Sequence, residues 1–358
     1  MILLILGACT ETETDIDTSR EEQVVHIDPS QEGDWVVATD TDSFRNRHDQ
    51  ELTLQYWYPS TDAHETRHEY GDLVASDVQD KGAPDCSKKR PVVMFSHGNG
   101  GMRYQSYFLT EYLASHGFVV VAPDHHGNTI FDMNEATQAE LIFRRPEDII
   151  DSFDHLLASD LLQDCVDPTA GYAMIGHSFG GYTTIALSGA LIDTEETAIF
   201  CATYPSSWLC GGVAEFAENN GAGVYDRGDD RIWASVPLAP AGYEVLFANL
   251  DKIDVPMLYM GGGKDTSTGM TWSVQPLYDG VIARKWLVEF PLAGHYSFTN
   301  ACDILPTYDD CGEGYLSPPD THRLINEIVI AFLGKELGYT GWESSFPPDS
   351  TDLLWTEN

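Results

Sequence analysis

The sequence predicts a single α/β domain, in which helices cover a mostly parallel central sheet and antiparallel strands lie on its N-terminal side. Two observations lead to this fold class. Short continuous apolar runs, typical of strands buried on both faces, recur through the middle of the chain, and amphipathic helical patterns separate several of them. The runs lie at residues 92–95, 118–121, 172–175, 233–236, 257–260 and 286–290.

The segments before the first of these runs have a different pattern. Apolar residues alternate along 35–37 and 52–58, which is typical of antiparallel edge strands. Residues 62–90 are expected to form an irregular insertion. The folded domain is therefore predicted to span residues 35–338, followed by a C-terminal tail at 339–358.

Two amphipathic patterns indicate helices. One helix is expected to begin at Pro146, because proline is favoured in the first helical turn and apolar side chains then recur on one face. The other is expected to begin near Thr321, with its apolar face turned inward. Residues 191–230 interrupt the alternation and are predicted to form a small insertion over one end of the sheet.

The charge balance limits what the chain can bind. Its 358 residues include 57 Asp and Glu against 19 Lys and Arg, which gives a formal net charge of −38. Binding to nucleic acid needs clustered cations and is excluded, and anionic lipid surfaces would repel the chain. The expected partner is therefore an uncharged molecule, and the protein is expected to be a monomer.

The first nine residues carry no charge and end in the sequence LGAC at 6–9. This pattern resembles a bacterial lipobox, whose cysteine is lipidated, and predicts a truncated lipoprotein-type signal; an incidental cysteine in an apolar terminus is the alternative. Residues 10–34 are acidic and poor in apolar side chains, so we expect a disordered spacer. The protein would then be exported, either lipid-anchored at the bacterial cell envelope or secreted, and would contact a membrane only through Cys9.

Six further cysteines indicate disulfides. An even number in an exported chain is typical of a disulfide framework, whereas buried free thiols are expected if the protein stays in the cytosol. The third and fourth, and the fifth and sixth, are each nine residues apart and suit local disulfides, which leaves the first two for each other. In chain order they are Cys86, Cys165, Cys201, Cys210, Cys302 and Cys311.

A glycine-rich turn in the middle of the chain carries a candidate nucleophile. The sequence GHSFG at 176–180 follows an apolar run and precedes a helical stretch, which is the context that a nucleophile elbow requires. Its glycines allow a sharp turn that exposes the Ser178 hydroxyl. A glycine-rich turn without chemistry is the alternative, but the strand and helix on either side favour catalysis.

A serine nucleophile needs a base and an orienting acid, and after an elbow these follow in the order acid, then histidine. Asp265 comes shortly after the fifth apolar run, and His295 shortly after the sixth. Both would lie at the carboxyl ends of their strands, whereas the rival acids Asp251 and Asp254 precede the fifth run. We therefore predict Ser178, Asp265 and His295 as a triad, with His295 as the base.

Backbone N–H groups are expected to form an oxyanion hole beside the serine. Phe179 follows the nucleophile and supplies one group, and Asn99, in the glycine-rich loop after the first apolar run, supplies the other. His97 in the same loop is expected to order it by hydrogen bonding. The predicted walls of the substrate pocket are Met102, Phe179, Trp208, Pro240 and Tyr296.

Two clusters of possible metal ligands are expected to have other roles. Asp124, His125 and His126 are adjacent in one loop, where neighbours rarely converge on a single ion, so a structural role near the pocket is favoured. The acidic segment 309–313 matches no EF-hand spacing and is expected to be a solvated loop. The cysteines show no CxxC spacing for zinc. Neither a metal nor a cofactor is therefore predicted.

Three segments resemble the platelet-activating factor acetylhydrolase branch of the α/β-hydrolases: FSHGNGG at 95–101, ASHGFVV at 114–120 and GHSFGG at 176–181. Bacterial members are often described as dienelactone-hydrolase-like, and polyester-cleaving cutinases are close relatives. The resemblance extends over about residues 35–335 and implies the same triad and the same oxyanion N–H groups. True dienelactone hydrolases use a cysteine where this chain has Ser178.

The resemblance implies a serine carboxylic-ester hydrolase that acts on short-chain or lipid-like esters, as in lipid degradation, through an acyl-enzyme and without a cofactor. A cutinase-like polyester hydrolase is one alternative, favoured by the cysteine pair after His295, since several polyesterases carry a late disulfide. A catalytically silent hydrolase fold that only binds ligands is another. Such proteins usually lose a triad residue, whereas this chain keeps all three.

Overall fold

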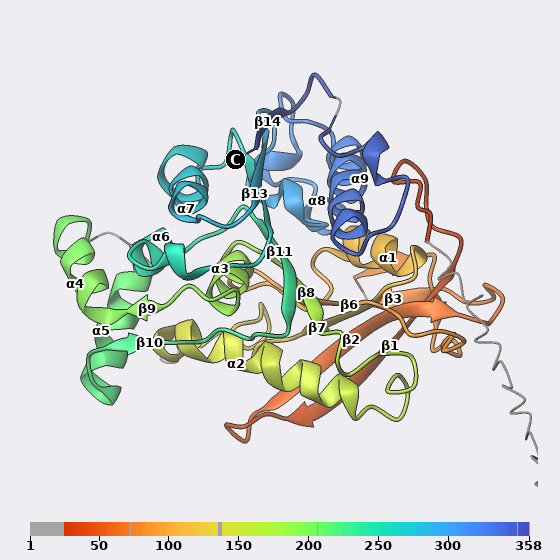
Figure 1. The fold of residues 1–358 in the computed structure, drawn as a ribbon, viewed down its shortest axis with the longest axis horizontal. Coiled ribbons are helices and arrows are strands. Elements are labelled where there is room, and N and C mark those ends of the chain that lie inside the picture. Colours follow the sequence, from red (N-terminus) through yellow and green to blue (C-terminus); the bar gives the residue numbers. More distant parts are fainter. Residues whose placement is uncertain (1–24, 72, 135–137, 206, 349, 358) are drawn as a thin grey trace, which may run out of the picture.

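The computed structural model describes residues 25–71, 73–134, 138–205, 207–348 and 350–357. Within them, ten strands form one sheet in the order β14-β13-β12-β11-β8-β6-β7-β2-β1-β5 (Figure 1). Their bounds are β1 Val36–Arg45, β2 Glu51–Ser60, β5 Gln79–Asp80, β6 Val92–Ser96, β7 Val119–Pro123, β8 Tyr172–His177, β11 Ile232–Leu238, β12 Met257–Gly262, β13 Lys285–Phe290 and β14 Leu354–Glu357.

Six neighbouring strands in the middle of this sheet, from β7 to β13, pair in parallel. On the N-terminal side, β2 pairs antiparallel with β7, and β1 pairs antiparallel with β2. At the opposite edge, β14 pairs antiparallel with β13. The predicted fold class, a single α/β domain with antiparallel N-terminal strands, is confirmed.

Helices cover both faces of the sheet (Figure 1). The helices of the described residues are α1 Tyr107–Ser115, α2 Gln138–Leu157, α3 Phe179–Leu187, α4 Thr194–Thr203, α5 Trp208–Asn220, α6 Tyr243–Leu246, α7 Gln275–Gly280, α8 Ala301–Ile304 and α9 Pro318–Glu336. Alternate side chains of a central strand therefore enter different cores. In β6, Val92 and Met94 share a cluster with α2, whereas Val93 and Phe95 share one with α1 and α9.

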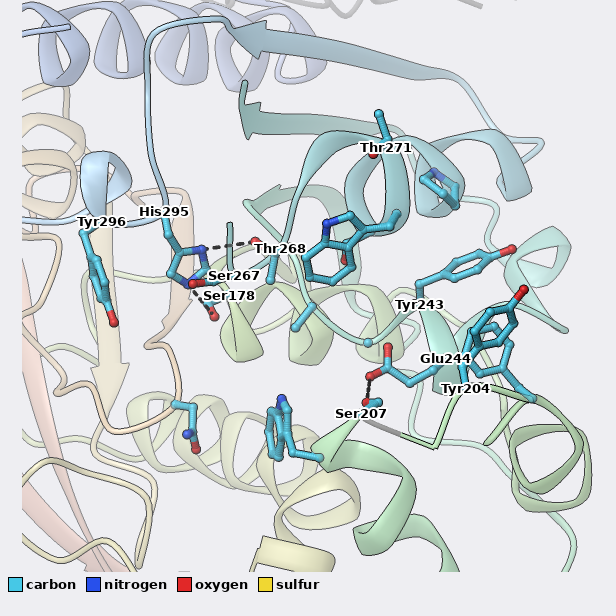
Figure 2. Close-up of a pocket in the computed structure, with 18 residues that line it drawn as sticks. Ser178, Tyr204, Ser207, Tyr243, Glu244, Ser267, Thr268, Thr271, His295 and Tyr296 are labelled. Atoms are coloured by element: carbon cyan, nitrogen blue, oxygen red, sulfur yellow. Dashed lines mark hydrogen bonds between the residues drawn. The ribbon is translucent and has the colours of Figure 1, made fainter. Parts of the chain in front are cut away.

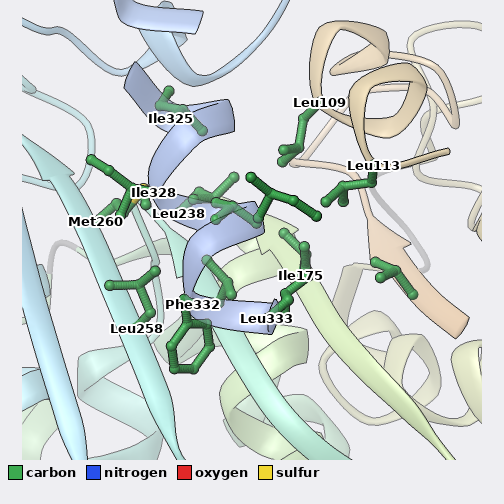
Figure 3. Packing of buried hydrophobic residues seen from close by; sticks show 14 of the residues in the cluster. Leu109, Leu113, Ile175, Leu238, Leu258, Met260, Ile325, Ile328, Phe332 and Leu333 are labelled. Atoms are coloured by element: carbon green, nitrogen blue, oxygen red, sulfur yellow. The ribbon is translucent and has the colours of Figure 1, made fainter. Parts of the chain in front are cut away.

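Helix α9 supplies much of the core on one face of the sheet. It begins slightly earlier than predicted, because Ser317 caps it by accepting the Asp320 N–H at 3.3 Å. Figure 3 shows its apolar side chains between those of the strands and those of α1. The cluster includes Ile325, Ile328, Phe332 and Leu333 from α9, Ile175, Leu238, Leu258 and Met260 from the strands, and Leu109 and Leu113 from α1.

The prediction that a helix begins at Pro146 is wrong, because α2 starts well before it and the proline lies inside the helix. A proline inside a helix leaves the carbonyl four residues earlier without its N–H partner. Here the Tyr182 hydroxyl donates to that carbonyl, Ile142 O, at 3.0 Å, and Arg227 Nε donates to Phe143 O at 3.2 Å. Hydrogen bonds from distant residues thus compensate for the missing helical one.

Packed structure extends beyond the predicted domain at both ends. Residues 25–34 belong to the predicted spacer, yet Ile27 is buried in the core and its N–H donates to Thr340 O at 2.8 Å. In the predicted tail, β14 joins the sheet. Isolated apolar residues in a polar segment have too little periodicity to predict such pairing. Residues 10–24 of the spacer, and the lipobox at Cys9, lie outside the described residues.

The three predicted disulfides are present. They join Cys86 to Cys165, Cys201 to Cys210 and Cys302 to Cys311. The second joins α4 to α5, and these two helices, with the short strands β9 Ile192–Asp193 and β10 Val224–Tyr225, make up most of the segment 191–230. Disulfides of this number indicate an exported protein, since the cytoplasm keeps thiols reduced. Every helix in the described part of the chain is too short or too polar to cross a lipid bilayer.

Candidate active site

The chain order around β6 creates a crevice at the carboxyl ends of the strands. After β6 the chain crosses through α1 to β7, and it then returns through α2 to β8 on the other side of β6. Because α1 and α3 lie on opposite faces of the sheet, the segments that follow β6 and β8 diverge. The loop at 97–101 and Ser178 lie at this point, and the loops after β12 and β13 bring Asp265 and His295 to the same edge.

Ser178 has a strained backbone conformation between β8 and α3, with φ at 57° and ψ at −114°. Close contacts explain the glycines around it: a Cβ on Gly176 would lie 2.2 Å from Gly180 O, and a Cβ on Gly180 would lie 1.9 Å from Ser96 O. A non-glycine residue in such a conformation costs about 1–3 kcal/mol, which the surrounding structure must offset. The Ser178 N–H donates to Leu238 O at 2.9 Å and ties the turn to β11.

The structure brings the three predicted triad side chains into one hydrogen-bonded chain. His295 Nε2 lies 3.0 Å from Ser178 Oγ (Figure 2), and His295 Nδ1 lies 2.8 Å from Asp265 Oδ2. Because a carboxylate can only accept, Nδ1 carries the proton and Nε2 faces the serine hydroxyl as an acceptor. Asp265 and His295 are only 7% and 8% exposed, so the hydrogen bond between them is shielded from water.

Hydrogen-bond donors hold Asp265 as a carboxylate. The N–H groups of Ser267 and Thr268 donate to Oδ1 at 2.7 and 2.8 Å, and the Thr268 hydroxyl donates to Oδ2 at 2.8 Å. Burial raises the pKa of Asp265, but the hydrogen bond and charge of His295, together with the Thr268 donors, outweigh it, so the pKa lies below its ordinary value. Asp265 is therefore charged at neutral pH. Spacing alone does not reveal Thr268, because hydroxyl residues are common in turns.

The two predicted oxyanion N–H groups have no acceptor among the described residues. In the loop after β6, the three glycines donate their N–H groups to nearby oxygens, whereas Asn99 does not. Phe179 is the first residue of α3, and the first N–H groups of a helix have no carbonyl of the same helix to bond. Asn99 lines the same cavity as Ser178, and a Cβ on Gly98 would lie 3.4 Å from Ser178 Cβ, so the loop and the elbow are in contact.

Gln105 and His177 connect the loop after β6 to His295. Gln105 Oε1 accepts the Gly98 N–H at 3.0 Å, and Gln105 Nε2 donates to His177 Nδ1 at 3.2 Å. His177 Nε2 donates in turn to His295 O at 2.9 Å. These bonds fix His177 as the neutral tautomer that carries its proton on Nε2.

A second network of buried groups supports the same loop. Arg145 is fully buried and donates to Ser96 Oγ at 2.9 Å, to His97 O and to Asn128 Oδ1. Asn128 Nδ2 donates to Asn99 Oδ1 at 2.7 Å. Burial lowers the pKa of Arg145 to about 9, so the guanidinium remains charged at neutral pH. One buried cation thus positions the segment that carries Asn99.

Two buried histidines beneath the site are held neutral. As expected, His97 orders its loop: Nδ1 donates to Gly98 O at 2.7 Å, while Nε2 accepts the His125 N–H at 3.1 Å. Like His177, it has no ring nitrogen left for a second proton. Burial lowers the pKa of His177 to about 3 and that of His97 well below its ordinary value.

We expect the free energy of unfolding to decrease as the pH falls below about 6.5, because the unfolded chain then binds protons that folded His97 and His177 do not. Each contributes about 1.4 kcal/mol per pH unit until its folded pKa is reached. Burial raises the pKa of Glu111 to about 7 and that of Asp148 to about 6, which opposes this trend over part of the range. Urea denaturation between about pH 6 and about pH 4.5 should show a slope that is smaller in His177→Gln by an amount approaching about 1.4 kcal/mol per pH unit. Parallel slopes would contradict the prediction.

An open cavity of about 800 Å³ lies beside Ser178 and His295 (Figure 2). It is bounded by the loops after β11, β12 and β13 and by the segment that contains α4 and α5. Its walls include several aromatic and polar side chains that sequence patterns do not reveal: Phe200, Tyr204, Tyr243, Glu244, Thr271 and Trp272.

Some of the predicted pocket walls lie elsewhere. Trp208 and Tyr296 line the cavity, whereas Met102 and Pro240 do not. Met102 packs into the hydrophobic core with α1 and α9, and Pro240 lies behind the elbow, where its Cα would be 2.7 Å from a Cβ on Gly181. The Phe179 ring is fully buried beneath Trp208, with the ring centroids 4.9 Å apart.

The candidate metal ligands do not converge. Asp124 forms an ion pair with Arg103 at 2.5 Å, and His125 bonds Asp148 at 2.9 Å. Asp310 accepts a backbone N–H from the loop after β13 at 2.6 Å. Across the residues that the structure describes, no group of three or more His, Cys, Asp or Glu side chains is arranged to hold a metal ion.

Residues 82–203 match the family model of chlorophyllase, a family of the α/β-hydrolase superfamily. The match covers about a third of the chain, includes Asn99 and Ser178, and ends before Asp265 and His295. No curated protein matches the chain. Over the part that carries its candidate nucleophile, the chain is similar to an α/β-hydrolase family of ester hydrolases.

Proposed function

We propose that this protein is a serine carboxylic-ester hydrolase that acts on short-chain or lipid-like esters. The observation that carries the proposal is the hydrogen-bonded chain from Ser178 through His295 to Asp265, set on a strained elbow. A glycine-rich turn without chemistry requires neither the strain nor the base. The similarity to chlorophyllase supports ester hydrolysis, and the acetylhydrolase branch stays a prediction.

In the proposed reaction, Ser178 Oγ attacks the ester carbonyl carbon while His295 Nε2 takes its proton. The carbonyl oxygen becomes an oxyanion, to which the N–H groups of Asn99 and Phe179 donate. The bond between the carbonyl carbon and the alcohol oxygen then breaks, and His295 returns the proton to the leaving alcohol. Water attacks the acyl-enzyme with the help of the same base, which releases the acid and regenerates Ser178, while Asp265 stays ionised throughout.

Covalent labelling tests the proposal. A fluorophosphonate probe should modify wild-type protein at Ser178, identified by mass spectrometry of the peptide, and should not modify Ser178→Ala. The wild-type protein should also hydrolyse p-nitrophenyl acetate. A folded wild-type protein that shows neither labelling nor hydrolysis would instead be a ligand-binding protein with a hydrolase-like fold.

A comparison of substrates separates the ester classes. We suggest p-nitrophenyl esters of increasing acyl length, a short-chain phospholipid and a soluble polyester oligomer. Preference for acetyl esters supports an acetylhydrolase-like activity. Preference for the oligomer supports the cutinase-like alternative, which Trp208 and Trp272 favour because they are 47% and 53% exposed in the open cavity.

Replacing Gln105 by leucine should lower kcat by about 100-fold with a smaller change in KM, because the loop with Asn99 and the elbow lose their common partner. Gln105 does not line the cavity, so it acts as a positioning residue. Steady-state kinetics on p-nitrophenyl acetate check this, with exposed Gln163→Leu as the matched control. A change confined to KM would show that Gln105 does not support the transition state.

We also propose that the mature protein is held at the cell envelope by a lipid on Cys9. The sequence before Cys9 and the disulfides of an exported chain support this proposal. Metabolic labelling with a palmitate analogue in a bacterial host should mark the wild-type protein and not Cys9→Ala.

A further inference from the structure

The cavity beside Ser178 has an uneven charge. Among the described residues that line it, Glu244 is the only carboxylate, and none is a lysine or an arginine. Figure 2 shows Glu244 on the far side of the cavity from Ser178 and His295. Because the cavity wall carries one carboxylate and no cationic side chain, it should disfavour the binding of an anionic ester and favour the binding of a cationic one.

Glu244 is held in position without being neutralised. Ser207, the N-cap of α5, donates its hydroxyl to Glu244 Oε1 and accepts the Leu209 N–H at 3.3 Å. The disulfide between α4 and α5 restrains this wall of the cavity. In the described part of the chain, Glu244 has no ion-pair partner. The carboxylate therefore keeps its charge available to a ligand.

Aromatic rings line the same side of the cavity as this carboxylate. Figure 2 shows Tyr204 and Tyr243 on the side of the cavity where Glu244 lies. The Phe200 ring lies 5.0 Å from that of Tyr204 and 6.0 Å from that of Tyr243, and all three line the cavity. Tyr204 is 60% exposed, so the ring is accessible. Aromatic faces attract an ammonium group by about 0.5–2 kcal/mol, and a nearby carboxylate adds to that attraction.

We propose that the Glu244 side of the cavity binds the ammonium group of a cationic carboxylic ester, so that alkylammonium esters are better substrates than neutral esters of the same shape. The inference rests on the proposed ester hydrolysis, because it assigns a substrate class to the same site. Ser178 and His295 perform the same chemistry, and Glu244 with Tyr204 selects the charge.

Charged and neutral isosteres test this inference. The first pair is acetylcholine and its analogue in which tert-butyl replaces trimethylammonium, with the cation on the alcohol. The second pair has the cation on the acyl group. It consists of the methyl ester of γ-trimethylammonio-butyrate and the methyl ester in which a tert-butyl group replaces the trimethylammonium group. In at least one pair, the cationic ester should have a kcat/KM about 10-fold higher. Glu244→Gln should reduce that ratio to near one, and Tyr204→Leu, a second variant at an exposed position, should reduce it in part.

Glu195→Gln is the matched control, since it removes the same charge from an exposed site on α4 and should keep the ratio. Equal kcat/KM values within both pairs, while the neutral esters are hydrolysed, would overturn the inference and leave the proposed function intact. If no ester is hydrolysed, the proposed function fails. Calorimetric titration with acetylcholine then tests separately whether the Glu244 side of the cavity binds an ammonium group. Weaker binding by Glu244→Gln than by wild type supports the subsite, and equal binding overturns it.

Discussion

Ser178→Ala is expected to lower kcat on p-nitrophenyl acetate by about a million-fold, since removal of a triad nucleophile removes the acyl-enzyme route. The Ser178 side chain lines the cavity and makes no cap hydrogen bond to α3, and alanine keeps the Cβ that the strained backbone already accommodates. The variant should therefore fold normally. Initial rates and thermal unfolding of the same preparation check both expectations.

The matched control is Ser43→Ala, an exposed serine in β1, which should retain wild-type rates. Removing His295 as well as Ser178 should cause little further loss, because the two act as one unit. Hydrolysis by Ser178→Ala at more than a small fraction of the wild-type rate would show that another residue is the nucleophile.

Arg145→Met is expected to reduce the free energy of unfolding by about 3–5 kcal/mol, because it leaves buried acceptors without their donor. Those acceptors include Ser96 Oγ, Thr183 Oγ1 at 3.2 Å and the carbonyl of His97. The melting temperature should fall by roughly 10 °C. Differential scanning calorimetry and urea denaturation measure these changes.

Arg47→Met provides the comparison for Arg145→Met. Arg47 is 42% exposed and pairs with Asp151 at 2.6 Å, so its loss should cost at most about 1 kcal/mol. Equal destabilisation by the two substitutions would mean that the network under the loop contributes no more than a surface ion pair. Destabilisation without any change in kcat would mean that Arg145 supports the fold and not the position of Asn99.

The strands and the candidate triad could be predicted from the sequence for the same physical reason. A parallel strand buried on both faces excludes polar residues, so its apolar run is visible in the sequence. The carboxyl ends of such strands share one edge of the sheet, so polar residues that follow the runs within a few positions are expected to meet there. Ser178, Asp265 and His295 each follow a run in this way.

Other features depend on partners that are distant in the chain. Gln105 binds His177, which is 72 residues away, and nothing in the local sequence of either residue indicates this contact. Pro146 has the local pattern of a helix start. The Ile142 carbonyl that it leaves without a helical partner is bonded by Tyr182, which is 40 residues away in the chain. Glu244 has a distinctive environment only after α4 and α5 fold over the cavity.

The order of strands in the sheet has a consequence for when activity arises. Ser178 and His295 are 117 residues apart in the chain and meet only after β12 and β13 have joined β11 and β8. Residues 354–357, as β14, pair with the outer edge of β13. A nascent or partly translocated chain therefore has a serine without its base. We therefore expect the proposed ester cleavage to begin only after the C-terminal strands have docked.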